Sequence, residues 1–357
     1  MIAAAWMALV LAQDGPAVWD PGKTWVFMVG VLEWKDPFLG RFPKKDRRDA
    51  ELASLFGKRG VPGRQIVFLK DEEATLGRIR KEFAAFLGKA DGTVIVYYAG
   101  HGDRDASGAA SFIPYDAEGP LESSGWSVRS IFDDLEKHFK GTGALLLADC
   151  CYSGALAVEA RKRKGRVSCL ASSRSSAEST GNWTFTEGLL AGFRGEASVD
   201  LDGDGQVRLG ELAAFSEQEL AFSEGQLPSF HAPGADGSLV IAPAGKKKPP
   251  RSGERLEVES KGAWYPARIL EEDGTRLRVR YAGYGAEWDE WVGPDRARAW
   301  KPAHHVAGTR VEVRWKTEWH PSTILEGRLG VHRIHYEGYG EEWDEWVSSD
   351  RIRPAGR

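Results

Sequence analysis

The sequence is poor in cysteine, has no long apolar segment and carries little net charge. Its three cysteines, Cys150, Cys151 and Cys169, are too few for a disulfide framework and lack the spacing of a structural zinc site. A net charge of −4 gives no electrostatic basis for binding nucleic acid or an anionic membrane, so we expect neither as a partner. No segment is long and apolar enough to span a bilayer. The 357 residues nevertheless exceed what one core usually fills, so we expect several domains.

The amino terminus contains a short apolar stretch over residues 2–12, followed by polar residues. Val10 and Ala12 fit the small-residue pattern of a cleavage site, although no Lys or Arg precedes the stretch. We interpret residues 1–20 as a signal peptide and lead-in, which predicts export to the periplasm, the cell envelope or the extracellular space. A frayed start or a misplaced initiator in a cytoplasmic protein is the alternative.

Strand-like and helix-like segments alternate over residues 23–243. Apolar strands are expected at residues 24–32, 65–70, 93–100, 143–150, 166–173 and 237–243. Amphipathic helices are expected at residues 46–60, 73–88 and 130–141. This alternation predicts an α/β domain with a mostly parallel sheet and helices on both faces. Residues 244–253, "AGKKKPPRSG", combine like charges with proline and predict a basic linker.

A repeat with a period of 55 residues follows the linker. The segment from Trp264, which contains "YAGYGAEWDEWV", aligns without a gap to the segment from Trp319, which contains "YEGYGEEWDEWV". Each unit alternates apolar and polar residues between glycine turns and has no helical stretch of note. The repeat therefore predicts two small all-β barrels, over residues 254–300 and 307–355.

Two predicted strands of the α/β domain end in residues suited to nucleophilic chemistry. "VIVYYAGHG" leads to His101, and "LLLADCCYSG" leads to Cys150 and Cys151. The carboxyl ends of parallel strands meet at one edge of a sheet, and a thiol becomes a nucleophile when a histidine takes its proton. Gly102 could offer its N–H group to an oxyanion. Cys169 lies in mid-strand and is expected to pack, whereas either of the adjacent cysteines could be the nucleophile.

These motifs resemble those of caspase-like cysteine peptidases, nearest to metacaspases and bacterial orthocaspases. "YYAGHG" precedes "DCCYSG" with 50 residues between His101 and Cys151, and the resemblance covers about residues 24–243. In that family the nucleophile is the cysteine of D-x-C-x-S-G, which implies Cys151 here and leaves Cys150 at the variable position. The resemblance implies His101 as base and later acid, with the N–H groups of Gly102 and Cys151 around the oxyanion. It implies no third catalytic residue.

The resemblance also implies a preference for the residue before the cleaved bond, P1. In metacaspases an acidic pocket receives Arg or Lys, and the matching carboxylates are Asp49 and Asp149. Two carboxylates bind a guanidinium well. True caspases cut after Asp and use arginines in that pocket, an alternative that Lys44, Arg47 and Arg48 leave open. We expect a cysteine endopeptidase that prefers a basic P1 residue in protein or peptide substrates. A catalytically silent adaptor that binds through the barrels is the rival interpretation.

Residues 159–167, "EARKRKGRV", form a basic run after the cysteine motif. A solvated loop is the usual meaning of such a run. The sharper hypothesis is self-cleavage within this loop, after one of the residues from Arg161 to Arg166.

Residues 200–211, "DLDGDGQVRLGE", match the spacing of an EF-hand calcium loop. The expected ligands are Asp200, Asp202, Asp204, the backbone carbonyl of Gln206, and Glu211. Arg208 places a cation at loop position nine, where a ligand is usual. We expect Ca²⁺ as a candidate cofactor that the chemistry does not require. A loop that only shapes a turn is the alternative.

The barrel repeats resemble the Tudor-knot or chromo-barrel family, whose hallmark is the "YGAEWDEWV" and "YGEEWDEWV" segments. In that family an aromatic cage binds methylated lysine by cation–π attraction. The matching positions are Tyr265, Tyr281, Tyr284 and Trp288 in the first unit, and His320, Tyr336, Tyr339 and Trp343 in the second. Trp315 would extend the second set where the first has Ser260. The resemblance implies recruitment of a peptide or methylated cation. The alternative is that these aromatics only stabilise barrels with small cores.

Overall fold

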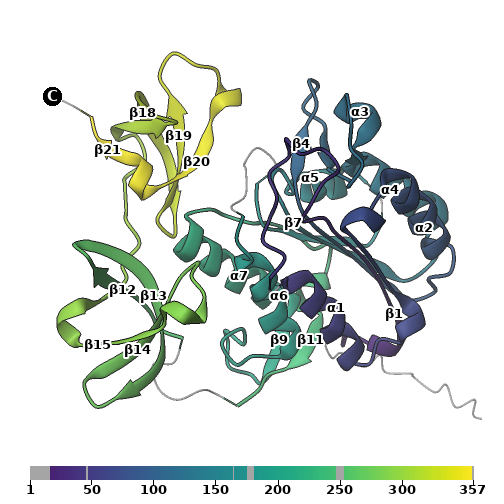
Figure 1. Ribbon diagram of the computed structural model, residues 1–357, viewed down its shortest axis with the longest axis horizontal. Coiled ribbons are helices and arrows are strands. Elements are labelled where there is room, and N and C mark those ends of the chain that lie inside the picture. The colour runs from purple at the N-terminus through teal and green to yellow at the C-terminus, as the bar shows by residue number, and fades with distance from the viewer. Residues whose placement is uncertain (1–16, 46, 164, 175–180, 247–252, 356–357) are drawn as a thin grey trace, which may run out of the picture.

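A computed structural model describes residues 17–355 except 46, 164, 175–180 and 247–252. An α/β domain lies beside two small β domains, with the last helix of the α/β domain between them (Figure 1). Within the described ranges, no helix combines the length and the apolar character needed to cross a membrane. Residues 1–16 of the predicted signal peptide and lead-in, and most of the predicted linker, lie outside the described residues.

The α/β domain is built on a six-stranded sheet in the order β10-β8-β7-β3-β1-β2. Its strands are β1 (Thr24–Gly30), β2 (Ile66–Lys70), β3 (Thr93–Ala99), β7 (Gly143–Asp149), β8 (Val167–Ala171) and β10 (Ser229–His231). β10 pairs antiparallel with β8 at one edge, and the other five strands are parallel. This arrangement confirms the predicted α/β fold.

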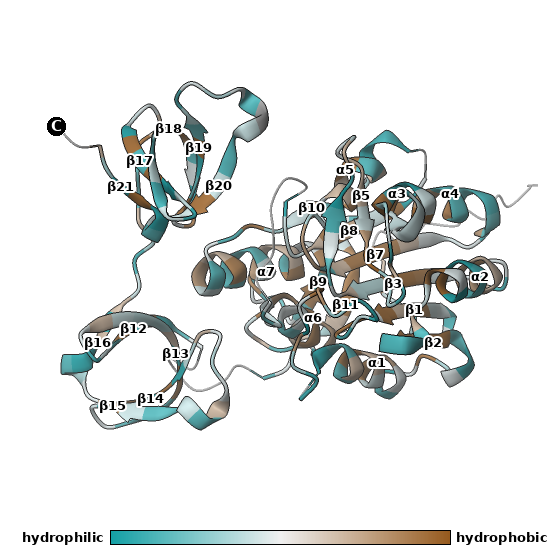
Figure 2. Cartoon of the chain, turned by 45° about the horizontal axis from the view of Figure 1, so that its top comes forward, coloured by the Kyte–Doolittle hydropathy of each residue, from teal (hydrophilic) through white to brown (hydrophobic). Residues whose placement is uncertain are grey.

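Helices cover both faces of this sheet, which explains why its strands are apolar throughout (Figure 2). One face packs against α2 (Leu76–Leu87), α4 (Val128–His138) and α5 (Ala155–Lys162). The other packs against α1 (Arg48–Lys58), α6 (Thr184–Arg194) and α7 (Leu209–Glu224). Successive residues point to opposite faces, so Leu146 and Leu147 of β7 belong to different cores. The short helix α3 (Leu121–Ser124) and a small sheet of β4 (Gly102–Arg104), β5 (Ala110–Phe112) and β6 (Trp126–Ser127) follow β3.

Two limits of the α/β domain differ from the expected ones. The strand expected at residues 237–243 does not join the main sheet. β11 (Val240–Pro243) instead pairs with β9 (Gln206–Arg208) in a separate two-stranded sheet. The domain also begins before residue 23, because the Trp19 ring packs edge-on against Phe56 and Phe193 at centroid distances of 6.2 and 5.5 Å. The buried Trp19 makes the end of the expected lead-in part of the core.

The basic run at residues 159–167 is helical only up to Lys162. Helix α5 extends to Lys162, and Arg163 forms ion pairs of 2.8 to 2.9 Å with Glu159 and with two acidic residues of α4. The helix disfavours cleavage after Arg161 or Lys162. Arg163 has an extended backbone, and Gly165 and Arg166 are exposed and lie outside any helix or strand. Self-cleavage after these residues therefore stays a prediction, and Lys164 lies outside the described residues.

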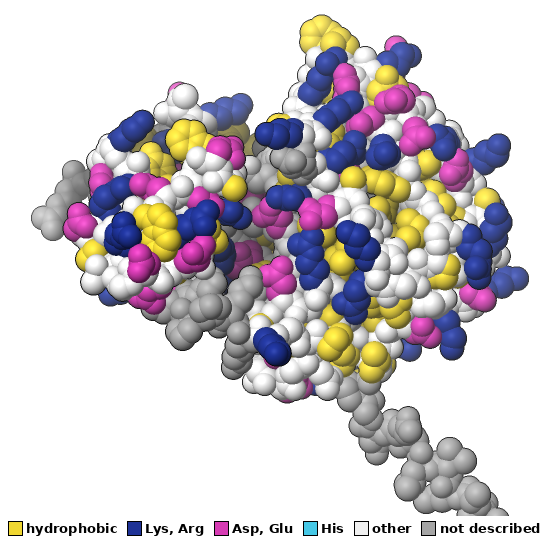
Figure 3. All heavy atoms as spheres, turned by 60° about the horizontal axis from the view of Figure 1, so that its bottom comes forward, with side chains coloured by type: hydrophobic (Ala, Val, Ile, Leu, Met, Phe, Trp, Pro, Cys, Tyr) yellow, Lys and Arg dark blue, Asp and Glu magenta, His cyan; other side chains and the backbone are white. Residues whose placement is uncertain are grey.

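Each repeat unit forms a five-stranded antiparallel domain with the same strand order. The first, barrel 1, consists of β12 (Arg255–Ser260), β13 (Ala263–Asp273), β14 (Arg276–Tyr281), β15 (Glu290–Val292) and β16 (Ala297–Ala299). The second, barrel 2, consists of β17 (Arg310–Trp315), β18 (Glu318–Arg328), β19 (Val331–Tyr336), β20 (Glu345–Ser348) and β21 (Ile352–Pro354). This confirms two small all-β domains. Acidic and basic side chains are interspersed over the face in Figure 3, in keeping with the small net charge.

Candidate active site

The register of the central strands brings the predicted catalytic residues to one edge of the sheet. Ala99 at the end of β3 pairs with Asp149 at the end of β7, and His101 and Cys151 each lie two residues beyond that pair. A Cβ atom on Gly102 would lie only 2.2 Å from the carbonyl oxygen of Cys151. Only glycine permits this approach of the two backbones. The loops that carry His101 and Cys151 are therefore in direct contact.

The His101 ring packs against two aromatic side chains, with one ring nitrogen engaged. Its centroid lies 4.2 Å from that of Trp34 and 4.8 Å from that of Phe42. Its Nε2 atom lies 2.7 Å from the carbonyl oxygen of Gly40. A carbonyl only accepts, so Nε2 carries the proton and Nδ1 keeps the basic lone pair. The backbone of Gly40 therefore orients the histidine ring.

The adjacent cysteines lie in opposite environments. Cys150 is 3% exposed and packs in the core, and burial raises the pKa of its thiol well above the ordinary value. Cys151 is half-buried, in the turn where Tyr152 adopts a φ of +56°. The thiolate is the attacking species, so a thiol that burial keeps protonated is a poor nucleophile. This difference favours Cys151 over Cys150.

Two serines after β8 hold the turn that carries both cysteines. The Ser172 hydroxyl accepts a hydrogen bond from the Cys150 N–H at 3.1 Å, and the Ser173 hydroxyl donates to the Cys150 carbonyl at 3.0 Å. Ser153 and Ser173 also exchange two N–H to hydroxyl bonds, of 3.2 and 3.3 Å. No role for these serines was expected from the sequence. Their signal is a pair of small polar residues directly after an apolar strand.

Asp149 lies buried beneath the cysteine turn. Its carboxylate accepts a 2.6 Å hydrogen bond from the Thr186 hydroxyl, whose oxygen also lies 2.7 Å from the Tyr97 hydroxyl. Burial nevertheless raises the pKa of Asp149 to about 7. Its ionised form is therefore poorly stabilised by its present surroundings, and a nearby cation would favour it.

Asp49 is not open to a ligand as the sequence suggested. Its side chain is fully buried, and its carboxylate accepts bonds of 2.8 and 2.7 Å from the Arg47 guanidinium. Arg47 also bonds to the Gly30 carbonyl at 3.0 Å and to Asp71 at 2.8 Å. A buried carboxylate needs such a partner. The sequence predicted that Asp49 would bind the guanidinium of a substrate arginine, but in the structure Asp49 binds the guanidinium of Arg47.

Asp49 and Asp149 nevertheless lie on the same face of the sheet. Gly30, Ala99 and Asp149 form one row across β1, β3 and β7, and a Cβ atom on Gly30 would lie 2.0 Å from the Asp49 carboxylate. Neighbouring strands lie about 4.8 Å apart. The two acids thus flank the small side chain of Ala99, and Asp49 is the one neutralised by Arg47.

The calcium-like loop brings three of its five expected donors together, with an arginine beside them. Carboxylate oxygens of Asp200, Asp202 and Asp204 lie within 4.8 Å of one another. The Arg208 guanidinium lies 2.5 Å from Asp204 and 3.5 Å from Asp202. β9 at the end of the loop pairs with β11. Glu211 is not part of this group, and its two carboxylate oxygens accept the N–H groups of Leu201 and Arg208, each at 2.8 Å. The aspartate oxygens suit calcium in type and spacing, and Arg208 is a competing cation.

The aromatic residues of barrel 1 form an open row. Tyr265, Tyr281, Tyr284 and Trp288 follow one another with centroid distances of 6.1 to 6.2 Å and interplanar angles of 71 to 90°. Perpendicular rings of this kind can line a shallow surface for a cation. Ser260, which matches Trp315 of barrel 2, adds no ring to close the row.

In barrel 2 the rings close into a circle. The members are His320, Tyr336, Tyr339, Trp343 and Trp315, with centroid distances of 5.8 to 6.5 Å. Trp315 contacts both His320 and Trp343, which joins the two ends of the series. Barrel 2 therefore has a closed circle of rings, whereas barrel 1 has an open row.

Comparison with protein families assigns all three domains. The caspase domain family matches residues 45–251, more than half of the chain. The chain belongs to the caspase domain family. The Agenet domain matches residues 253–302, and the Tudor-knot, described as the RNA binding activity-knot of a chromodomain, matches residues 306–354. These matches confirm the caspase-like and Tudor-like resemblances and assign barrel 1 to the Agenet domain.

Several solved structures are similar to this chain at low sequence identity. A protein of Geobacter sulfurreducens is 13% identical, with a TM-score of 0.45, over 62% of this chain and 99% of that one. Caspase-1 of Spodoptera frugiperda is 10% identical, with a TM-score of 0.42, over 62% and 92%. The Drosophila initiator caspase Dronc is 11% identical, with a TM-score of 0.43, over 66% and 96%. A comparison with curated proteins gave no match.

Proposed function

We propose that the caspase domain is a cysteine endopeptidase with Cys151 as nucleophile and His101 as base. The main support is the close contact of the Cys151 backbone with Gly102. His101 lies next to Gly102, and its hydrogen bond to the Gly40 carbonyl determines its tautomer. The exposure of Cys151 relative to Cys150 supports the choice between them. Together these features supply a thiol, a base and a rigid backbone around the position of the reacting carbonyl.

In the proposed reaction, Nδ1 of His101 takes the proton of the Cys151 thiol while sulfur bonds to the substrate carbonyl carbon. The oxyanion accepts hydrogen bonds from the N–H groups of Gly102 and Cys151. Hydrogen bonds alternate along an antiparallel ladder, and Ile113 N–H donates to the carbonyl of His101. By this alternation Gly102 directs its N–H away from β5. His101 then protonates the leaving amine, the C–N bond breaks, and water, deprotonated by His101, hydrolyses the thioester.

We propose a basic P1 residue, with Asp149 as the recognising carboxylate. A cationic side chain near Asp149 would stabilise an ionised form that burial now disfavours. Cleavage after Arg should then increase as the pH rises through about 7, because the acceptor becomes charged. Cleavage after Asp would be repelled by the same group. Arg47 keeps Asp49 out of direct recognition in this arrangement.

A reporter-peptide assay tests the enzyme and its rival together. Matched peptides ending in Arg, Lys or Asp are offered to the wild type, to Cys151→Ala and to the matched variant Cys150→Ala. We expect cleavage after Arg or Lys, loss of at least about 1,000-fold in kcat/KM for Cys151→Ala, and activity retained by Cys150→Ala. Cleavage by Cys151→Ala would contradict the nucleophile. Faster cleavage after Asp would contradict the basic preference. No cleavage of a diverse peptide library would favour the silent adaptor.

We propose that residues 200–211 bind calcium weakly, because Arg208 must first leave the acidic oxygens. Calcium would supply positive charge between Asp200, Asp202, Asp204 and Glu211 and take no part in peptide hydrolysis. Calorimetric titration of Arg208→Gln should show tighter binding than the wild type, with Glu211→Gln as the ligand-deficient control. Absence of calcium heat from Arg208→Gln would contradict this site.

We propose that the barrels recruit a peptide bearing a methylated or other cationic group, with barrel 2 as the stronger site. The support is its closed circle of rings. Barrel 2 carries more acidic than basic side chains, which disfavours an RNA ligand despite the wording of its family description. Titrations with a trimethyl-lysine peptide, the unmethylated peptide and a short RNA separate these cases. Tighter binding of RNA than of the methylated peptide would contradict the proposal.

A further inference from the structure

Barrel 2 is docked on the caspase domain at the carboxyl end of α7. A buried apolar contact joins Ala221, Leu227, Leu329, Val331 and Trp346. A Cβ atom on Gly225, the C-cap of α7, would lie 2.3 Å from Cβ of Ser348 in barrel 2. Glycine is needed at this cap both for its φ of +60° and for the close approach of the barrel.

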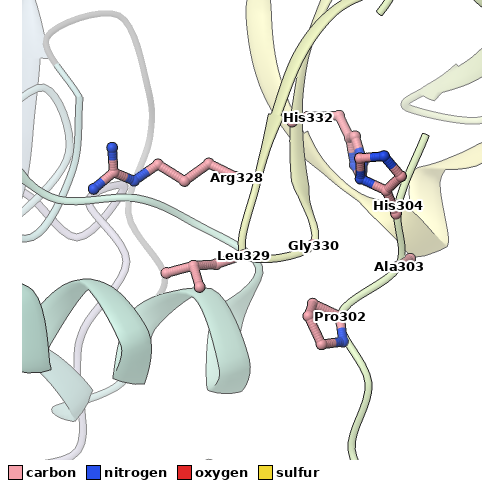
Figure 4. A pocket seen from close by; sticks show the side chains of 8 residues that line it. Pro302, Ala303, His304, Arg328, Leu329, Gly330 and His332 are labelled. Carbon is pink, nitrogen blue, oxygen red and sulfur yellow. The ribbon is translucent and has the colours of Figure 1, made fainter. Parts of the chain in front are cut away.

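Charged contacts flank this apolar group. Arg328 forms a 2.6 Å ion pair with Glu217 of α7. The Arg174 guanidinium lies over the Trp346 ring, 5.5 Å from its centroid. Figure 4 shows Arg328 and Leu329 extending from the β18–β19 turn towards the caspase domain, while His304 and His332 lie on the other side of that turn. The docked face of barrel 2 thus consists of this turn, Trp346 and Ser348.

The docked face adjoins the residues that hold the cysteine turn. Arg174 directly follows Ser172 and Ser173 in the chain. Gln226, next to the Gly225 cap, donates from Nε2 to the Ser172 carbonyl at 3.1 Å. Ser172 and Ser173 in turn bond to the N–H and carbonyl of Cys150. A continuous series of contacts therefore runs from barrel 2 to the residue before the proposed nucleophile.

Barrel 1 lacks this contact although it carries the same repeat. The positions that match Arg328, Leu329 and Val331 are Asp273, Gly274 and Arg276, and this turn is exposed. Trp291, which matches Trp346, is 39% exposed and lies under Arg276 of its own barrel, at 5.6 Å. Trp291 is therefore a matched control for Trp346.

We propose that docking of barrel 2 positions the cysteine turn, so that release of barrel 2 lowers the reactivity of Cys151. Arg174 and Gln226 are the positioning residues, because each joins the docked face to Ser172–Ser173. The proposal rests on the proposed function only in naming Cys151 as the nucleophile. The two states are the docked and the released barrel, and a partner that competes for the docked face would favour the released one.

The test uses the full chain and the variants Trp346→Ala and Trp291→Ala. The rate of Cys151 alkylation by iodoacetamide is followed by mass spectrometry from pH 5 to 9, beside hydrolysis of the reporter peptide. Small-angle X-ray scattering reports whether barrel 2 is released. We expect Trp346→Ala to slow alkylation and to lower kcat by about three- to tenfold, and to shift the pH profile of alkylation. Trp291→Ala should match the wild type. A released barrel 2 with an unchanged alkylation profile would overturn the proposal.

Charge-reversal variants distinguish loss of the docking contact from loss of folding. Glu217→Arg should slow alkylation, and adding Arg328→Glu should restore it by re-forming the pair in the opposite sense. A double variant no faster than Glu217→Arg would count against the docking contact. Gln226→Ala should keep barrel 2 docked and still slow alkylation. If the wild type cleaves no peptide, the endopeptidase proposal is wrong. If the alkylation profile of Cys151 is unchanged after release of barrel 2, the proposed coupling between docking and Cys151 reactivity is wrong.

Discussion

Barrel 1 and barrel 2 share a strand order and an identical "EWDEWV" segment, but they differ at several other positions of the repeat. Ser260 of barrel 1 corresponds to Trp315 of barrel 2, which closes the circle of rings. Leu277 corresponds to the buried His332. The exposed turn at Gly274 corresponds to the docked turn at Leu329. The repeated apolar pattern therefore determines the strand order of each barrel, whereas a few other positions determine which groups each barrel contacts.

The two barrels also attach to α7 by different physical means. Barrel 1 places Arg255 and Arg268 on Glu219, whose side chain is largely buried. Barrel 2 uses an apolar contact, with the Arg328–Glu217 pair at its more exposed edge. Breaking a buried pair leaves an unpaired charge, whereas an exposed pair contributes little. The attachment of barrel 1 should therefore be the more sensitive to loss of a single carboxylate.

The largest expected effect comes from removing the carboxylate through which each barrel attaches to α7. Glu219→Ala should destabilise the contact of barrel 1 with α7 by about 3 kcal/mol, because two guanidinium groups lose their partner. Glu217→Ala should cost about 1 kcal/mol or less at barrel 2. Hydrogen exchange along β12–β13 and β18–β19 measures both. Equal effects would show that the two attachments do not differ in this way.

The next effect concerns the buried histidine that only barrel 2 has at this position. Nε2 of His332 accepts the N–H of His305 at 3.1 Å, and burial lowers the pKa of His332 to about 4. In the unfolded state His332 is protonated as the pH falls below about 6.5, whereas in the folded state it is protonated only below about pH 4. Barrel 2 should therefore lose about 2–3 kcal/mol of stability as the pH falls through this window, and keep it above.

His332→Leu, which introduces the residue of barrel 1, provides the control for this pH effect. It should remove this part of the pH dependence. Hydrogen exchange of β17–β21 at pH 7 and pH 5 makes the measurement, with β12–β16 as the internal reference. The same acid sensitivity in wild type and His332→Leu would assign the effect to other groups.

A smaller effect compares the two aromatic cages. Trp343→Ala should weaken binding of a trimethyl-lysine peptide by about tenfold, because a ring of the closed circle is lost. The matched change Trp288→Ala in the open row of barrel 1 should weaken binding less. Fluorescence titration of both variants gives the affinities. A greater loss from Trp288→Ala would reverse the assignment of barrel 2 as the stronger site.

The smallest expected effect comes from exchanging the residues at the position where the two aromatic sets differ, Ser260 in barrel 1 and Trp315 in barrel 2. Trp315→Ser should reduce affinity for the same peptide by about threefold to fivefold, and Ser260→Trp should raise the affinity of barrel 1 by a similar factor. Calorimetry on the two single variants tests both directions. If neither affinity changes, closure of the circle plays no part in binding.

Local patterns predicted the fold class and part of the site. The alternation of apolar strands with amphipathic helices indicated the α/β domain, and the period of 55 residues indicated the twin barrels. The motifs around His101 and Cys151 marked two strand ends that the register then brought together. The strand at residues 237–243 was misplaced because an apolar segment does not reveal which strand it will pair with. Pairing partners depend on contacts between distant segments.

What the sequence determined by itself is therefore the type of each domain, the repeat and the likeness of its motifs to the caspase domain. Only the tertiary structure decided that the Gly40 carbonyl orients His101, that Arg47 occupies Asp49, and that Ser172 and Ser173 hold the cysteine turn. The physical reason is that a backbone carbonyl is the same in every residue type, so it leaves no trace in a sequence pattern. A buried charge likewise takes whichever partner the fold brings within reach.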